Sequence, residues 1–188
     1  YSGGAMTTVI AAAMAPKYAP IPHFVGAAAG GTPADMEWMG KALGNRPNPG
    51  FGILAGTMIG LEREYPDRMN IYDRMRPEWK KRMRNGLKDS CVSTMVASFS
   101  GQSMRTVFNN VDVYKQHREF KVVRENSPLY YPLNPKMPLY FYHGNQDIAV
   151  PVAKLKQLAH RYCKAGTHVT LATICLLYTS PSPRDGLL

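Results

Sequence analysis

The 188-residue sequence lacks several patterns that mark common functional classes. Its three cysteines, Cys91, Cys163 and Cys175, form neither a CxxC pair nor a Cys/His spacing typical of zinc ligands, so no metal site is predicted. No apolar run approaches the roughly 18 residues of a membrane-spanning helix. Acidic residues are scarce, 13 against 23 Lys and Arg, and the net charge is +10.

The positive charge concentrates between Arg68 and Ser90, in the stretch RMNIYDRMRPEWKKRMRNGLKDS. One interpretation is the solvated surface of a helical segment. Another is attraction to an anionic interface such as lipid head groups or fatty-acid products. Charge alone would also allow nucleic acid, but no recognition motif accompanies it and the aromatic residues are not interleaved as stacking platforms. The sequence therefore predicts no nucleic-acid partner.

Strand-like and helix-like segments alternate on either side of a long helical and irregular region. Outside that region the expected helices are 7–19 and 152–166, and the expected strands are 22–31, 137–144 and 167–173. Inside it the expected helices are 34–43, 51–65, 76–87, 89–101 and 105–126. This order predicts a parallel α/β sheet that carries a helical insertion of about ninety residues.

The chain opens YSGGA, in which Ser2 and the glycines after it form half of a Gly-x-Ser-x-Gly nucleophile elbow. A serine hydroxyl becomes a good nucleophile only when a base takes its proton and donors stabilise the oxyanion. Small neighbours allow the tight turn from strand to helix, and the N–H group of Gly3 is the expected oxyanion donor. The alternative interpretation is that Ser2 caps the following helix.

A second candidate is Asp147 in PLYFYHGNQDIAVPV, just past the carboxyl end of an expected strand, where catalytic groups of α/β proteins gather. A carboxylate there can orient a histidine and stabilise the imidazolium that forms in acyl transfer. The alternative is that Asp147 caps the helix beginning near Val152.

The histidine base of such a triad follows the acid in chain order. Only His160 and His168 follow Asp147, and they fall within an expected helix and an expected strand. The base is therefore predicted to be missing. Of the other histidines, His143 is expected to shape the turn before Asp147, and structural or surface roles are expected for His23 and His117.

Three segments occur in order and together resemble the fungal secretory lipases of the lipase A-like type: YSGGA, GLEREYPD and PKMPLYFYHGNQDIAVPVAKLKQLAHRYCKAG. The likeness runs from Tyr1 to about Thr173. It implies an α/β-hydrolase core with a helical cap inserted after the nucleophile, the cap supplying an acyl-chain tunnel and an interfacial surface. It also implies extracellular hydrolysis of triacylglycerols and other esters at a lipid–water interface, without a cofactor.

The resemblance further implies individual roles. Ser2 matches the nucleophile, Gly3 the oxyanion donor that follows it, and Asp147 the triad acid. Cys91 matches a cysteine that in relatives pairs with one upstream of the elbow.

We therefore expect a hydrolase core at 1–34 and 127–174, a cap at 35–126 and a non-native tail at 175–188. The tail expectation rests on CLLYTSPSPRD, which equals a translation of the adapter used in transposase-based sequencing libraries. The resulting interpretation is an internal fragment of a secreted serine lipase, inactive by itself because it lacks the catalytic histidine. Two alternatives stay open, a short-chain esterase or acyltransferase of the same fold and a non-catalytic hydrolase-like binding protein.

Overall fold

The structure is a computed structural model of the chain that describes residues 1–20, 23–109 and 118–174. The chain divides into two compact units. Unit 1 comprises residues 1–35 together with those from 127 onward, and unit 2 comprises residues 36–126. The expected tail at 175–188 and His117 lie outside the described residues.

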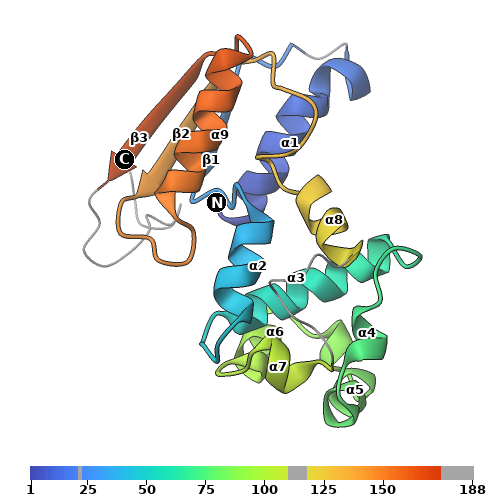
Figure 1. Cartoon of the computed structure of the whole chain (residues 1–188). Helices are drawn as coiled ribbons and strands as arrows, with labels where there is room; N and C mark the ends of the chain where they lie inside the picture. The colour runs from blue at the N-terminus through green and yellow to red at the C-terminus, as the bar shows by residue number, and fades with distance from the viewer. Residues whose placement is uncertain (21–22, 110–117, 175–188) are drawn as a thin grey trace. The chain divides into compact units, whose positions relative to one another are not determined.

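Unit 1 is built on a parallel sheet of three strands, as the alternating pattern predicted (Figure 1). The strands β1 (Ala27–Gly30), β2 (Leu139–Gly144) and β3 (Val169–Ile174) lie in that order across the sheet. The register aligns Ala27 with Leu139 and Leu139 with Val169. Helix α9 (Val152–Lys164) provides the crossover between the parallel strands β2 and β3, and helix α1 (Gly3–Tyr18) precedes β1.

The core of unit 1 lies on one face of this sheet. Along β2 the side chains alternate, so Leu139 and Phe141 are buried while Tyr140 on the opposite face is 44% exposed. Helix α1 contributes small residues to the core and α9 contributes larger ones: Ala5, Val9 and Ala12 from α1, and Leu155, Leu158 and Tyr162 from α9. Both helices therefore pack on the face that carries Phe141.

The strand expected at 22–31 is shorter in the structure. β1 begins at Ala27, whose N–H donates to the Pro138 carbonyl at 2.9 Å. Proline has no N–H with which to continue the ladder toward the preceding residues. Val25, two residues before β1, is 90% exposed, so the residues just before Ala27 do not belong to the sheet.

The regular secondary structure of unit 2 is helical in its described residues, apart from two isolated β-bridges. Its helices are α2 (Met36–Gly44), α3 (Phe51–Glu64), α4 (Ile71–Arg74), α5 (Pro77–Arg84), the 3-10 helix η1 (Leu87–Asp89), α6 (Val92–Phe99), α7 (Met104–Val107) and α8 (Arg118–Glu125). Trp79 stacks on Phe99 with ring centroids 4.4 Å apart, and Phe51 meets Phe99 edge-on at 6.3 Å. The same core buries six methionines: Met58, Met69, Met75, Met83, Met95 and Met104.

The prediction of a single helix over 105–126 is wrong. α7 ends at Val107 because Phe108 takes an extended backbone and forms an antiparallel bridge with Met75. A second helix, α8, begins at Arg118. A tertiary pairing with Met75, which local periodicity does not reveal, therefore overrides the helical pattern here.

Several features are absent from the part of the chain that the structure describes. None of these helices combines the length and apolar character needed to cross a membrane, and the longest, α1, has 16 residues. No group of three His, Cys, Asp or Glu side chains could hold a metal ion among the described residues. Cys91 and Cys163 are exposed free thiols.

Candidate active site

Ser2 occupies a sharp turn between the edge of the sheet and α1. Its φ of 52° and ψ of −120° make it the one non-glycine residue with a positive φ in the described ranges. Such a backbone is strained for a residue with a Cβ, and it persists only where the surrounding structure holds it. The Ser2 N–H donates to the Gly30 carbonyl at 2.9 Å, and the Met6 N–H donates to the Ser2 carbonyl at 3.0 Å. The turn is thus held by β1 on one side and by α1 on the other.

The side chain of Ser2 is exposed and makes no capping hydrogen bond to α1. The capping interpretation therefore does not describe this structure. Gly3 is the first residue of α1, where N–H groups have no partner within the helix. A Cβ added at Gly3 or Gly4 would meet no heavy atom within 4 Å, so the space beside Ser2 is open.

The glycines that this turn requires lie at the end of β1. A Cβ on Gly30 would fall 2.1 Å from the Tyr142 ring, and one on Gly31 would fall 2.6 Å from the Tyr1 ring. Gly31 also has a φ of +55°. The rings of Tyr1 and Tyr142 lie 6.4 Å apart and tilted by 38°. The residue before Ser2 is therefore seated against the sheet where two glycines leave room.

Asp147 lies in the turn that follows β2. Its Oδ1 accepts hydrogen bonds from the N–H groups of Ala149 at 2.9 Å and Val150 at 2.8 Å. Bonds to an ionised acceptor are short and strong, so they fix the direction of the carboxylate. Both donors precede Val152, the first residue of α9, so Asp147 organises the turn before α9. Its side chain remains 20% exposed.

His143 closes the base of the same turn, in the shaping role that the sequence indicated. Its Nε2 donates to the Val150 carbonyl at 2.7 Å and lies 3.9 Å from Oδ2 of Asp147. The imidazole is fully buried, and its Nδ1 has no hydrogen-bond partner among the residues that the structure describes. A ring in this position supports the turn and cannot reach a substrate in solvent.

Ser2 and Asp147 lie at the same edge of the sheet. Ser2 is bonded to Gly30, the last residue of β1, and Asp147 follows Gly144, the last residue of the parallel neighbour β2. The carboxyl ends of parallel strands share one edge, which is where ligands bind in this class of sheet.

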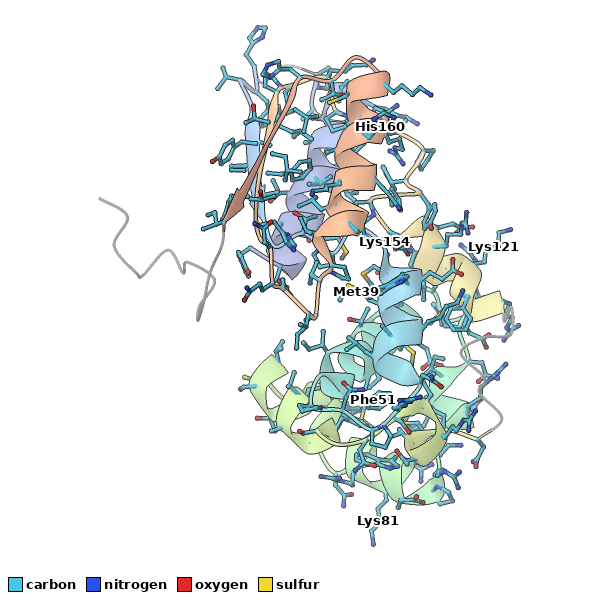
Figure 2. All side chains as sticks on the ribbon, turned by 60° about the vertical axis from the view of Figure 1, so that its left-hand side comes forward. Met39, Phe51, Lys81, Lys121, Lys154 and His160 are labelled. Carbon is cyan, nitrogen blue, oxygen red and sulfur yellow. The ribbon has the colours of Figure 1, made fainter. Side chains whose placement is uncertain are left out.

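The other described histidines of unit 1 lie elsewhere. His160 lies about 12 Å along α9 from its start, and Figure 2 shows it near the opposite end of that helix from Lys154. The carbonyl of His168 accepts the N–H of Leu139, at the amino end of β2. His23 precedes β1. Among the described histidines of unit 1, only the buried His143 lies at the edge of Ser2 and Asp147.

Sequence reasoning missed one cluster that supports this edge. Asp35, whose side chain is 2% exposed, pairs with Lys154 Nζ at 2.8 Å and accepts a hydrogen bond from the Tyr130 hydroxyl at 3.2 Å. Lys154 belongs to the first turn of α9, directly after the Asp147 turn. The pairing ties that turn to the segment after β1. No local sequence motif predicts this cluster, because Asp35 and Tyr130 are 95 residues apart in the sequence.

Unit 2 contains a small cavity of about 20 Å³ between its helices. It is lined by Met58, Met69, Ile71, Arg74, Met104, Glu119, Phe120 and Val123. Arg74 Nη2 and the buried Glu119 Oε1 lie 3.0 Å apart at its wall. A volume of this size holds about one water molecule. In this structure the cavity is therefore too small to hold an acyl chain.

A serine on a strained turn into a helix, with an acid after the next strand of a parallel sheet, is the arrangement of the α/β-hydrolase class. The fold agrees with that class. The structure matches lipase A of Candida antarctica in its closed state with a TM-score of 0.77 and 19% sequence identity. That match covers 94% of this chain and 42% of that one.

The family follows from the sequence comparison. The secretory lipase family matches residues 1–176, so the chain belongs to that family. Lipase 5 of Candida albicans is 30% identical over 174 residues, and the trichothecene C-3 esterase of Fusarium sporotrichioides is 26% identical over 176 residues. These matches cover 88% and 90% of this chain. The chain spans 37% and 39% of the length of these two relatives.

Proposed function

We propose that the protein carrying this chain is a secreted, serine-dependent triacylglycerol lipase. Ser2 is the nucleophile, the Gly3 N–H is an oxyanion donor and Asp147 is the triad acid. The observation that carries the proposal is the backbone of Ser2, whose φ of 52° is held by the bond to Gly30 at the carboxyl edge of the sheet. Strain of this kind concentrates at functional sites. Membership of the secretory lipase family supports both the reaction and an extracellular location.

The chemistry is acyl transfer in two steps. A histidine base supplied by the longer protein, and absent from this chain, takes the proton of Ser2 Oγ while that oxygen attacks the ester carbonyl. The oxyanion of the tetrahedral intermediate faces the Gly3 N–H. When the intermediate collapses, the bond to the glyceride oxygen breaks and the imidazolium returns a proton to it. Water then repeats the sequence on the acyl-serine and releases the fatty acid.

Asp147 is suited to orient that histidine. The N–H groups of Ala149 and Val150 hold its Oδ1, which leaves Oδ2 to accept a hydrogen bond from the imidazole. A carboxylate in this role fixes the tautomer of the base and stabilises the imidazolium. The mechanism uses no metal and no cofactor. We further propose that unit 2 is the cap of the enzyme and that the 188-residue chain alone is inactive, because losing a triad base costs several orders of magnitude in rate.

A second candidate is an esterase that acts on smaller or non-glyceride esters with the same triad. The relative named trichothecene C-3 esterase favours it, because it resembles this chain nearly as closely as the named lipase does. A non-catalytic binding protein would keep the fold without using Ser2.

The test uses the longer protein that contains this chain, with residues numbered as here. Ser2→Ala should lower kcat by about 10⁶-fold and Asp147→Asn by about 10⁴-fold. Ser93→Ala and Asp73→Asn, at exposed positions of unit 2, should leave kcat unchanged. Long-chain triacylglycerol as the preferred substrate supports a lipase, and preference for a short acetyl ester supports the esterase. Unchanged hydrolysis in Ser2→Ala would overturn both.

A further inference from the structure

We propose that the outer face of α5 and η1 is a docking surface for a lipid–water interface made anionic by fatty-acid carboxylates. This inference rests on the proposed function, because such carboxylates are the products of triacylglycerol hydrolysis. The surface, called here the basic face, consists of five cations: Lys80, Lys81, Arg82, Arg84 and Lys88.

The fold of unit 2 turns these cations outward. Trp79 and Met83 lie four residues apart on α5 and are both buried, Trp79 against the ring of Phe99. The opposite side of the helix therefore faces solvent, where Lys81 and Arg82 are exposed together with Arg84 and Lys88. Figure 2 shows the Lys81 side chain pointing away from unit 2.

The cations of the basic face form no ion pair with a carboxylate among the described residues, although Glu78 lies on α5 and Asp89 on η1. In the described part of the chain none of these five cations lies within ion-pair distance of an Asp or Glu, whereas five other cations of unit 2 do: Lys41, Arg68, Arg74, Arg118 and Arg124. Arg68 pairs with Glu125 and Lys41 pairs with Glu37. From residue 76 to residue 89 the sequence holds six cations and two acids, a net charge of +4.

The basic face is instead held in place by neutral groups that leave its charge intact. Arg82 lies 4.5 Å above the Trp79 ring, and Lys80 lies 5.8 Å from the centre of the Tyr72 ring. Arg84 Nε donates to the Tyr72 hydroxyl at 3.0 Å. Like charges this close on one helix repel one another and destabilise it slightly. A helix that keeps these cations out of ion pairs despite their mutual repulsion is suited to an anionic partner outside the chain.

The surroundings of the cations favour a lipid surface over nucleic acid. Proteins that bind single strands offer aromatic rings on which bases stack. Here Trp79 is buried and lies beneath Arg82, so its ring face is already covered. The large exposed apolar residues that the structure describes also lie outside α5 and η1. The surface therefore adsorbs by charge, without inserting side chains among acyl chains.

The contribution of each cation to binding an anionic surface can be measured as a change in the partition coefficient. Each Lys or Arg near an anionic membrane surface raises the partition coefficient by about fivefold, and the attraction fades beyond the screening length of about 10 Å at 0.1 M salt. If hydrolysis produces the negative charge, the affinity of the protein for the interface rises as the product accumulates there.

The experiment measures co-sedimentation of the 188-residue chain with neutral phosphatidylcholine vesicles that carry increasing fractions of oleate. It is run at alkaline pH, where oleate is ionised, without an ester substrate. Lys81→Gln/Lys88→Gln should lower the partition coefficient by about 25-fold, five for each cation. The matched control Lys156→Gln/Lys164→Gln removes two exposed cations from α9 and should change it by less than about twofold. Lys81→Arg/Lys88→Arg keeps both charges and should retain binding.

Raising the salt to about 1 M, where the screening length falls to about 3 Å, should abolish binding. Binding to vesicles with an anionic phospholipid but not with oleate, or tighter binding to a single-stranded oligonucleotide, would overturn the proposal. An equal loss in the α9 control would also overturn it. Ser2→Ala should bind as wild type does, so a failed catalytic assignment and a failed docking surface give different results. Circular dichroism verifies that each variant is folded.

Discussion

Replacing Lys154 with methionine isolates the buried ion pair that supports the Asp147 turn. Methionine keeps most of the length of the side chain and removes its charge. The Asp35 carboxylate, 2% exposed, then loses the ammonium group at 2.8 Å and keeps the Tyr130 hydroxyl at 3.2 Å. Because the Asp35 carboxylate is buried, hydration by water cannot replace the lost ion pair.

The size of the effect follows from the burial of the two partners. Removing one member of a buried pair costs about 3–5 kcal/mol. Lys154 is 23% exposed, so water already screens part of the interaction, and we expect the loss to be about 2–3 kcal/mol. The pair Lys41–Glu37 has nearly the same separation, 2.7 Å, but Lys41 is 39% exposed. Lys41→Met should therefore cost only about 0.5 kcal/mol.

Hydrogen exchange resolves the two units separately, which a single melting curve does not. Amides of β2 report on unit 1 and amides of α3 on unit 2. In Lys154→Met the β2 amides should exchange about 30- to 150-fold faster, because a loss of about 2–3 kcal/mol in unfolding free energy raises the open population by that factor. Adding Asp35→Asn should restore more than half of the protection. Acceleration below about threefold, or a double variant worse than the sum of the two single variants, would refute the reasoning.

Two further predictions concern packing and pH. Gly52→Ala should destabilise unit 2 by about 2–3 kcal/mol, because the new Cβ falls 2.4 Å from the Val96 Cα. Gly60→Ala in the same helix meets nothing within 4 Å and should stabilise by about 0.5–1 kcal/mol; tryptophan fluorescence in urea compares the two, and equal effects would contradict the contact. Burial raises the pKa of Tyr162 from 10.0 to about 12, against the lowering by Arg161. A raised pKa means stability that is complete below pH 10 and lost as pH rises toward 12. Urea midpoints by circular dichroism across that range should fall for the wild type and fall less for Tyr162→Phe.

The sequence predicted the elements whose patterns are local and strong. β2 alternates as an aromatic strand should, and α9 carries Leu155, Leu158 and Tyr162 at helical spacing, so both were located to within a few residues. The parallel order followed from the alternation of strands and helices. Asp147 could be predicted as a candidate site residue because a polar turn after a clearly patterned strand is recognisable from the sequence alone.

What the sequence could not provide depends on contacts between distant segments. The φ of Ser2 is held by Gly30, 28 residues away, and Asp35 is bound by Lys154 on a different element. The need for glycine at Gly31 arises from the Tyr1 ring, which no local rule places there. The helix expected across 105–126 is interrupted at Phe108 by a bridge to Met75. In each case a pairing in three dimensions decides the local conformation.

Two hydrogen bonds join the place where the chain leaves unit 1 to the place where it returns. The Leu129 N–H donates to the Ala34 carbonyl at 2.9 Å, and the Tyr130 hydroxyl donates to Asp35 at 3.2 Å. The residues between these two places therefore form a long connection whose two ends are in contact. Closing a loop of any length at such a junction costs only slightly more as the loop grows, about 0.6 kcal/mol for each doubling. An ancestor could have lengthened, shortened or exchanged this connection while the register of β1 on β2 stayed the same. Insertions and deletions within residues 36–126 are therefore compatible with an unchanged sheet in unit 1.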